Sequence, residues 1–118
     1  MSIESRLADL PPPDPCRLRM RSARDGDAHV IRLTGELDLT SADGVEQELR
    51  RVELTDAHAI VVDLRELTFI DSMGVRLLFQ ASTRSLQGTN RLVLTRGRKD
   101  VQRVFEICDL VGRLPFAD

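Results

Sequence analysis

Aromatic side chains, cysteine and long apolar runs are scarce in this chain, and each scarcity excludes a class of protein. There is no Trp and no Tyr, and four Phe give an aromatic fraction of 3%, so stacked bases and aromatic ligand cages have little material. The two cysteines, Cys16 and Cys108, lie far apart with no CxxC spacing, a pattern typical of reduced thiols. No apolar run reaches the roughly 18 residues that a membrane-spanning helix needs.

Charge and length narrow the class further. The chain has 118 residues, 42% of them apolar, which is enough for one core and one domain. The 17 basic and 19 acidic residues give a net charge of −2, whereas a generic nucleic-acid binder has a strongly basic surface. The first ten residues hold neither a basic leader nor an apolar stretch. We therefore expect no secretory signal and a cytoplasmic location.

The prolines mark a boundary near the N-terminus. Four of the five prolines lie between Pro11 and Pro15, and such a segment blocks both helix and central strand. We expect residues 1–15 to form a proline-rich flexible tail and residues 16–118 to form the domain. The tail is interpreted as a spacer, with a docking peptide for a proline-binding module as the alternative.

Hydrophobic periodicity predicts alternating strands and helices after the tail. Residues 16–21 alternate strictly, with Cys16, Leu18 and Met20 facing a core, and 30–34 form a second strand of the same hairpin. A continuous apolar run at 59–64 indicates a central parallel strand. The predicted helices cover about 40–52, 72–86 and 100–108, and a further strand covers 92–94. This order implies an α/β fold with a mixed, mostly parallel sheet and helices packed on one face.

One segment, residues 67–75 (LTFIDSMGV), places a hydroxyl where an apolar strand passes into a helix. The first turn of a helix has free N–H groups and a partial positive charge. Ser72 can cap this helix, or it can carry a phosphate whose oxygens accept bonds from the same N–H groups. Gly74 suits either interpretation, because a missing side chain permits close approach.

The helix that follows has two contrasting faces. Its predicted sheet-facing side holds Val75, Leu77, Leu78, Phe79, Ala81 and Leu86. The opposite side holds Met73, Arg76, Gln80, Thr83 and Arg84. Met and Arg are enriched at protein interfaces, so this side is a candidate partner-binding surface, made of Met73, Arg76, Gln80 and Arg84. An ordinary solvated face with one exposed Met is the alternative.

Two carboxylates are expected near Ser72. Asp38 follows the second strand and Asp71 precedes the serine. If their strands are neighbours, both would orient the hydroxyl and repel an added phosphate of about −1.5 to −2 charges. The alternative is that Asp38 caps its own turn and Asp71 caps the second helix. Asp63 is expected to end its strand.

The sequence contains no motif that indicates a catalytic site or a cofactor site. A hydrolase with Ser72 as nucleophile needs a base within reach, and only His29 and His58 exist, both predicted at the other end of the sheet. There is no GxSxG, no zinc-ligand spacing, no GxxxxGK[ST] and no GxGxxG. We expect a binding module that is not an enzyme and has no cofactor and no metal.

The motifs together resemble the STAS domain family, specifically the bacterial anti-sigma factor antagonists. The resemblance covers about residues 16–117 and is carried by GELD at 35–38, VVDL at 61–64, FIDSMG at 69–74 and the closing helix at 101–107. It implies a sheet of four to five strands with helices on one face. It also implies that Ser72 is phosphorylated by an anti-sigma factor that is an ATP-dependent serine kinase. The unphosphorylated form would bind that factor and free the sigma factor, and a phosphatase would reset the switch.

Two features leave the partner open. The family often has Ser or Gly after the acceptor and Gly-Leu beyond it, where this chain has Met73 and then Gly74-Val75. Met73 would lie in the interface itself. The alternative is a STAS subunit of another assembly, either a lipid-transport complex or a stressosome-like signalling particle, that docks through the same helix.

Overall fold

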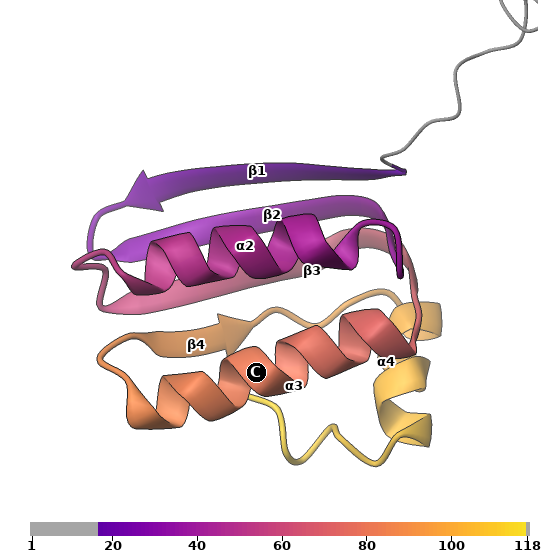
Figure 1. The fold of residues 1–118 in the computed structure, drawn as a ribbon. Coiled ribbons are helices and arrows are strands. Elements are labelled where there is room, and N and C mark those ends of the chain that lie inside the picture. The colour runs from indigo at the N-terminus through magenta and orange to yellow at the C-terminus, as the bar shows by residue number, and fades with distance from the viewer. Residues whose placement is uncertain (1–16, 118) are drawn as a thin grey trace, which may run out of the picture.

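The computed structural model describes residues 17–117. The prediction of a flexible tail at 1–15, and the predicted core-facing Cys16, lie outside the described residues. Figure 1 shows a sheet with helices in front of it and beside it. In chain order the elements are β1 (Leu18–Asp25), β2 (Ala28–Leu37), α2 (Ala42–Glu53), β3 (Ala59–Ile70), α3 (Ser72–Gln87), β4 (Arg91–Leu94) and α4 (Lys99–Ile107).

The strands form a four-stranded sheet in the order β1-β2-β3-β4. β1 and β2 are the predicted hairpin, antiparallel from Leu18 opposite Gly35 to Asp25 opposite Ala28. The β2–β3 and β3–β4 pairs are parallel, so α2 and α3 are crossover connections. Gly35 has a φ of +107°, and a Cβ there would meet the Arg17 carbonyl oxygen at 2.0 Å. The first residue of GELD is therefore required by the backbone.

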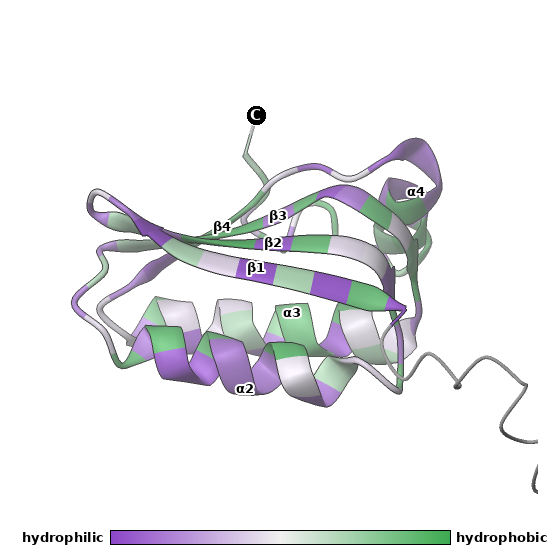
Figure 2. Cartoon of the chain, turned by 90° about the horizontal axis from the view of Figure 1, so that it is seen from above, coloured by the Kyte–Doolittle hydropathy of each residue, from purple (hydrophilic) through white to green (hydrophobic). Residues whose placement is uncertain are grey.

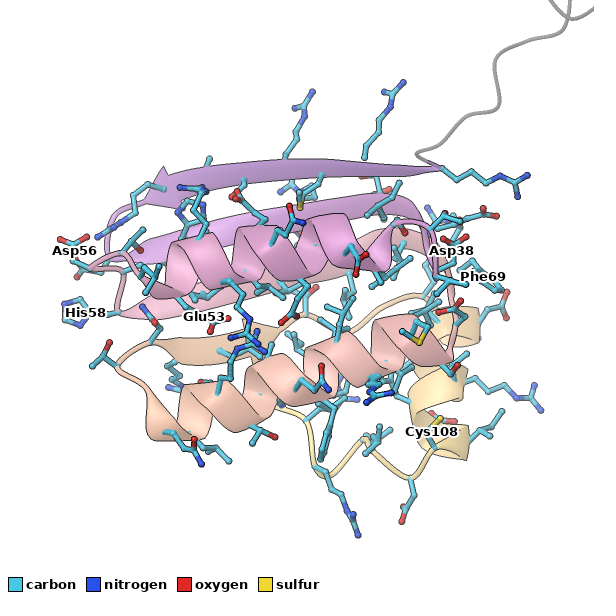
Figure 3. All side chains as sticks on the ribbon, in the orientation of Figure 1. Asp38, Glu53, Asp56, His58, Phe69 and Cys108 are labelled. Carbon is cyan, nitrogen blue, oxygen red and sulfur yellow. The ribbon has the colours of Figure 1, made fainter. Side chains whose placement is uncertain are left out.

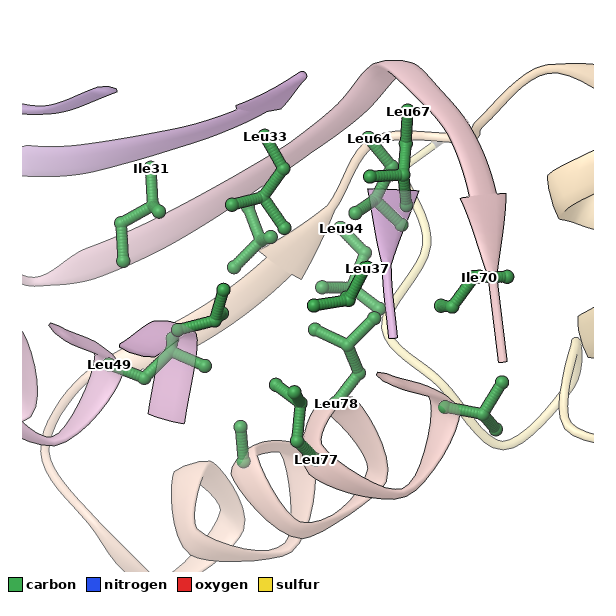
Figure 4. Packing of buried hydrophobic residues seen from close by; sticks show 14 of the residues in the cluster. Ile31, Leu33, Leu37, Leu49, Leu64, Leu67, Ile70, Leu77, Leu78 and Leu94 are labelled. Carbon is green, nitrogen blue, oxygen red and sulfur yellow. The ribbon is translucent and has the colours of Figure 1, made fainter. Parts of the chain in front are cut away.

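The main core lies between the sheet and the helix pair α2 and α3. Both helices lie under the same face of the sheet in Figure 2, as the fold prediction required. Figure 4 shows buried side chains of this layer, among them Ile31, Leu33, Leu37, Leu49, Leu64, Leu67, Ile70, Leu77, Leu78 and Leu94. One detail is added to the prediction. α4 packs against β3 at the end of the sheet, beside the start of α3.

Two strand predictions need correction. Met20 was expected in the core but is 38% exposed, because β1 is the edge strand and has a neighbour on one side alone. Asp63 was expected to end its strand, yet it lies inside β3 and is 2% exposed. Its carboxylate accepts hydrogen bonds from Arg32 at 3.2 Å and from Arg65 at 2.8 and 3.0 Å. These bonds hold the pKa of Asp63 well below its usual range.

A polar cluster joins α2 to the hairpin at the end of the sheet remote from Ser72. Ser22 Oγ lies 2.6 Å from His29 Nε2, and burial, helped by the Arg51 charge, lowers the pKa of His29. Two hydrogen bonds from Arg51 to Glu48, at 2.6 and 2.9 Å, lower the pKa of Glu48 from 4.5 to about 2. Glu48 therefore stays charged in the folded protein at pH values between its lowered pKa of about 2 and its usual pKa of 4.5. In the unfolded chain the same carboxyl group would be largely protonated in this pH range.

The Glu48 pKa predicts acid sensitivity. A carboxyl group whose pKa is lowered by folding stabilises the fold above its unfolded pKa, and this contribution is lost as pH falls from about 5 to 2. Because Arg51 is 59% exposed, we expect about 1 to 2 kcal/mol, less than a fully buried pair would give. Glu48→Gln should flatten the dependence of the unfolding free energy on pH in this window. Urea titrations at several pH values measure this effect. Glu106→Gln, at an exposed glutamate, should match the wild type, and equal slopes in all three proteins would contradict the prediction.

Candidate functional site

Ser72 is the first residue of α3, directly after the end of β3. The connection is a single residue, Asp71, whose backbone is extended with φ −108° and ψ −175°. The chain therefore turns from strand to helix at the point where the sequence predicted it. The Ser72 side chain is exposed. Its hydroxyl has no hydrogen-bond partner within residues 17–117 and is open to modification.

Asp71, not Ser72, caps the helix. Its Oδ1 accepts hydrogen bonds from the N–H groups of Met73 at 2.9 Å and Gly74 at 3.1 Å. Its Oδ2 accepts a bond from the Leu39 N–H at 3.0 Å, so the same carboxylate also holds the loop between β2 and α2. The interpretation of Ser72 as the cap is wrong, and the alternative role of Asp71 is confirmed. The N–H groups of Met73 and Gly74, which were expected to donate to a phosphate on Ser72, already donate to Asp71.

Gly74 is required by packing within the protein. A Cβ at this position would lie 2.7 Å from Ile70 Cγ1, 2.9 Å from Leu37 Cγ and 3.0 Å from the Leu37 oxygen. The first turn of α3 thus lies directly against the ends of β2 and β3. The close approach predicted for Gly74 is made by these two strand ends, which fixes the position of Ser72 relative to the sheet.

Asp38 lies in the loop that Asp71 holds. Its Oδ1 accepts hydrogen bonds from the Thr40 N–H at 2.9 Å and the Thr40 hydroxyl at 2.6 Å, and these bonds lower the pKa of Asp38. Its role in its own turn is confirmed. The Asp71 N–H also donates to the Leu37 oxygen at 3.1 Å, so the β2–α2 loop lies beside the start of α3. Figure 3 shows Asp38 at the same end of the molecule as Phe69. An ionised carboxylate therefore stands at the end that carries Ser72.

The predicted partner-binding surface divides into two parts. Met73 is 37% exposed, and Arg76 and Gln80 are exposed. All three line a shallow groove of about 220 Å³ between α2 and α3. Arg84 differs, because its side chain is 21% exposed and forms ion pairs with Glu46 at 2.9 Å and Glu53 at 2.8 Å. Arg84 joins the two helices and does not belong to a free contact surface.

Two residues predicted on the sheet-facing side of α3 are exposed. Leu86 is 86% exposed, because it lies in the last turn of the helix, and Phe79 is 40% exposed. Phe79 lies at the edge of the buried arc, on the side that carries Ser72. The helical period alone cannot assign a residue at the border between the buried and the exposed side of a helix. Whether such a residue is buried depends on the elements that pack beside it.

Sequence reasoning missed a second surface beside Ser72. A hollow of about 240 Å³ is lined by Ser72, Val75, Arg76, Phe79, Cys108 and Leu110. Cys108 follows α4, and Figure 3 shows it close to the N-terminal half of α3. The α3 members follow the i, i+3, i+4, i+7 spacing of one helical stripe. That spacing is visible in the sequence, but the approach of Cys108 depends on the tertiary packing of α4.

The histidines lie where the sequence predicted. His29 is buried in β2 and His58 precedes β3, and Figure 3 shows His58 at the opposite end of the molecule from Asp38 and Phe69. No histidine base is near Ser72. Among residues 17–117, no three His, Cys, Asp or Glu side chains gather as metal ligands would. No helix in this part of the chain is long and apolar enough to cross a membrane.

Comparison with known proteins agrees with this geometry. The family model for the STAS domain matches residues 19–118. The chain belongs to the STAS domain family. Among curated STAS relatives, the anti-sigma-F factor antagonist RsfB of Mycobacterium tuberculosis is 31% identical over 68 residues, which are 58% of this chain and 56% of RsfB. The chain thus matches little more than half of that relative's length.

Solved structures share the STAS fold of this chain. An anti-sigma factor antagonist from Mycobacterium paratuberculosis superposes with a TM-score of 0.76 and 22% identity, over 91% of this chain and 89% of that one. SpoIIAA, an anti-sigma factor antagonist, superposes in its unphosphorylated form with a TM-score of 0.68 and 24% identity, over 85% of this chain and 89% of that one. Its phosphorylated form gives a TM-score of 0.60 and 23% identity over 86% and 91%.

Proposed function

We propose that this STAS protein is an anti-sigma factor antagonist controlled by phosphorylation of Ser72. The unphosphorylated form binds an anti-sigma factor that is a serine kinase, and this binding frees the sigma factor. Transfer of phosphate from ATP to Ser72 ends the binding, and a phosphatase restores it. In this proposal the protein is a cytoplasmic transcription regulator and not itself an enzyme. The related RsfB and SpoIIAA carry the same functional name.

The observation that carries the proposal is the freedom of the Ser72 hydroxyl. A serine at the start of a helix is ordinarily needed as a cap, but here Asp71 makes both capping bonds. Ser72 is therefore exposed on a rigid element with no structural task for its oxygen. A kinase can modify it without first opening the fold. The existence of a phosphorylated SpoIIAA structure supports the same chemistry in a protein of this fold.

Charge explains how the modification would switch binding. A phosphoserine adds about −1.5 to −2 charges, next to Asp71 and at the end of the molecule that holds Asp38. Its oxygens cannot take the N–H groups of Met73 and Gly74 unless Asp71 releases them. The added charge therefore remains directed outward, toward the surface where the partner binds. A partner surface that fits the neutral serine would meet an added negative charge.

The test is phosphate transfer by the anti-sigma factor kinase of the source organism. Incubation with kinase and ATP is expected to add one phosphate, and Ser72→Ala should reduce incorporation to background. Ser85→Ala serves as the matched control, because Ser85 lies on the same helix and its hydroxyl is bound to the Asn90 oxygen. Intact-mass measurement and sequencing of the labelled peptide give the result. Incorporation that persists in Ser72→Ala, or recovery of the protein with lipid-transport or stressosome-like subunits and not with the kinase, would contradict the proposal.

A further inference from the structure

The hollow between α3 and the end of α4 is the least explained surface near Ser72. Its lining includes the apolar side chains of Val75, Phe79 and Leu110 together with Ser72. Figure 1 shows the end of α4 beside the N-terminal half of α3, and Figure 3 places Cys108 there. The volume of about 240 Å³ is sufficient for one large aliphatic or aromatic side chain.

The hollow exposes part of an apolar surface, because Phe79 and Leu110 are not covered although Val75 beside them is buried. Phe105 on α4 is fully buried, and its ring packs edge-on against Phe116 at 5.2 Å. In contrast, Phe79 is 40% exposed and Leu110 is half-buried, and both line the hollow. Apolar side chains grouped at the rim of a hollow indicate an interaction site more strongly than the same side chains scattered singly. The fold of the domain does not require this exposure.

Arg76 supplies a polar contact at the same rim. Arg84, two turns further along α3, is held by Glu46 and Glu53, whereas Arg76 forms no ion pair within residues 17–117. Arginine beside an exposed aromatic ring is typical of the residues that dominate binding energies at protein interfaces. A free guanidinium at an apolar hollow selects a partner segment that carries an apolar side chain next to a carboxylate.

We propose that this hollow receives an apolar side chain of the anti-sigma factor, and that an adjacent carboxylate of that segment pairs with Arg76. The inference rests on the proposed function, since a kinase that reaches Ser72 comes into contact with a hollow that Ser72 itself lines. It extends the partner surface from the α2–α3 groove to the opposite flank of α3. The interface then includes Phe79, Cys108 and Leu110, which the predicted surface did not contain.

This geometry also gives phosphorylation a second effect on binding. Ser72 and Arg76 are four residues apart on α3, so their side chains lie on the same stripe. A phosphate on Ser72 is within reach of the Arg76 guanidinium and competes with the partner's carboxylate for it. The switch would thus remove an attractive contact while adding a repulsive charge.

The decisive experiment compares two apolar truncations on the same helix. Phe79→Ala removes a wall of the hollow, and Leu86→Ala removes an 86% exposed leucine far from it. We expect Phe79→Ala to raise the Kd for the anti-sigma factor kinase at least tenfold, and Leu86→Ala to leave it within twofold of wild type, by isothermal titration calorimetry. Thermal melts of both variants verify that the fold is intact.

A chemical probe repeats the test without truncating the helix. In a Cys16→Ser background, a maleimide directed at the exposed Cys108 places a bulky group at the hollow, and it should weaken binding by a similar factor. Bound kinase should also slow the maleimide reaction. If Phe79→Ala binds within twofold of wild type, the inference is wrong even though Ser72 labelling, and with it the proposed function, stands. If wild type neither binds nor is phosphorylated, both fail.

Discussion

Ser72→Asp is expected to lower the affinity for the anti-sigma factor by about a hundredfold while the melting temperature stays within a few degrees of wild type. A charge placed against a surface that fits a neutral group typically costs about 2 to 5 kcal/mol, or roughly 30- to 4,000-fold in Kd. The fold should tolerate the aspartate, because a negative charge near a helix N-terminus is favourable and Ser72 is exposed.

Ser72→Asn is the matched control for this charge. Asparagine has almost the shape of aspartate without its charge, so we expect its Kd within about fivefold of wild type. Titration calorimetry on all three proteins separates charge from size. If Ser72→Asn and Ser72→Asp lose a comparable amount of affinity, the partner discriminates against the size of the side chain at residue 72 and not against its charge.

Asp63→Ala is expected to destabilise the protein by about 3 to 5 kcal/mol, the largest effect on stability among our predictions. Removing one member of a buried ion pair leaves its partners without compensation. Asp63 is 2% exposed and accepts bonds from Arg32 on β2 and Arg65 on β3, and its Oδ1 also accepts the Thr95 hydroxyl at 3.1 Å. The side chains of Arg32 and Arg65 are 48% and 64% exposed, so water can solvate their charges after Asp63 is removed. We therefore expect a destabilisation in the lower half of the range of about 3 to 5 kcal/mol.

Chemical denaturation measures the loss, and Glu66→Ala is the control. Glu66 lies on the same strand but is 56% exposed, and its contact with Arg98 is 3.5 Å long; we expect less than about 1 kcal/mol from its removal. Because the pKa of Asp63 is held well below its usual range in the folded protein, its contribution should begin to decline below about pH 4 and shrink with further acidification, so the gap in unfolding free energy between Asp63→Ala and wild type should narrow in acid. A gap as wide at about pH 2.5 as at neutral pH would contradict this account.

Local patterns predicted much of the fold. The turn at Gly26, the alternation of β1, the apolar start of β3 and the 3.6-residue period of α3 each depend on neighbours within a few positions. The position of Ser72 was predicted for the same reason, because the end of β3, Asp71 and the start of α3 are consecutive in the chain. Local sequence therefore placed Ser72 at the start of α3 and Asp71 beside it.

The features that the sequence did not predict depend on contacts between residues that are far apart in the chain. A carboxylate inside an apolar run indicates a strand end, but β3 continues past Asp63 because Arg32, 31 residues earlier, lies beside it on β2. Arg84 falls on the solvent side of its own helix, and carboxylates of α2 cover it. Phe79 is exposed although its position borders the buried arc. Each of these depends on an element distant in sequence.

Asp71 caps α3 and the Ser72 hydroxyl does not, and this has a consequence for the evolution of such a protein. Since the helix start depends on the aspartate, the neighbouring alcohol can be replaced at little thermodynamic expense. Variants that have lost control would still fold and accumulate, permanently active or permanently silent according to the charge they acquired. Selection on regulation alone, with none on solubility or abundance, would then have to keep the serine in place.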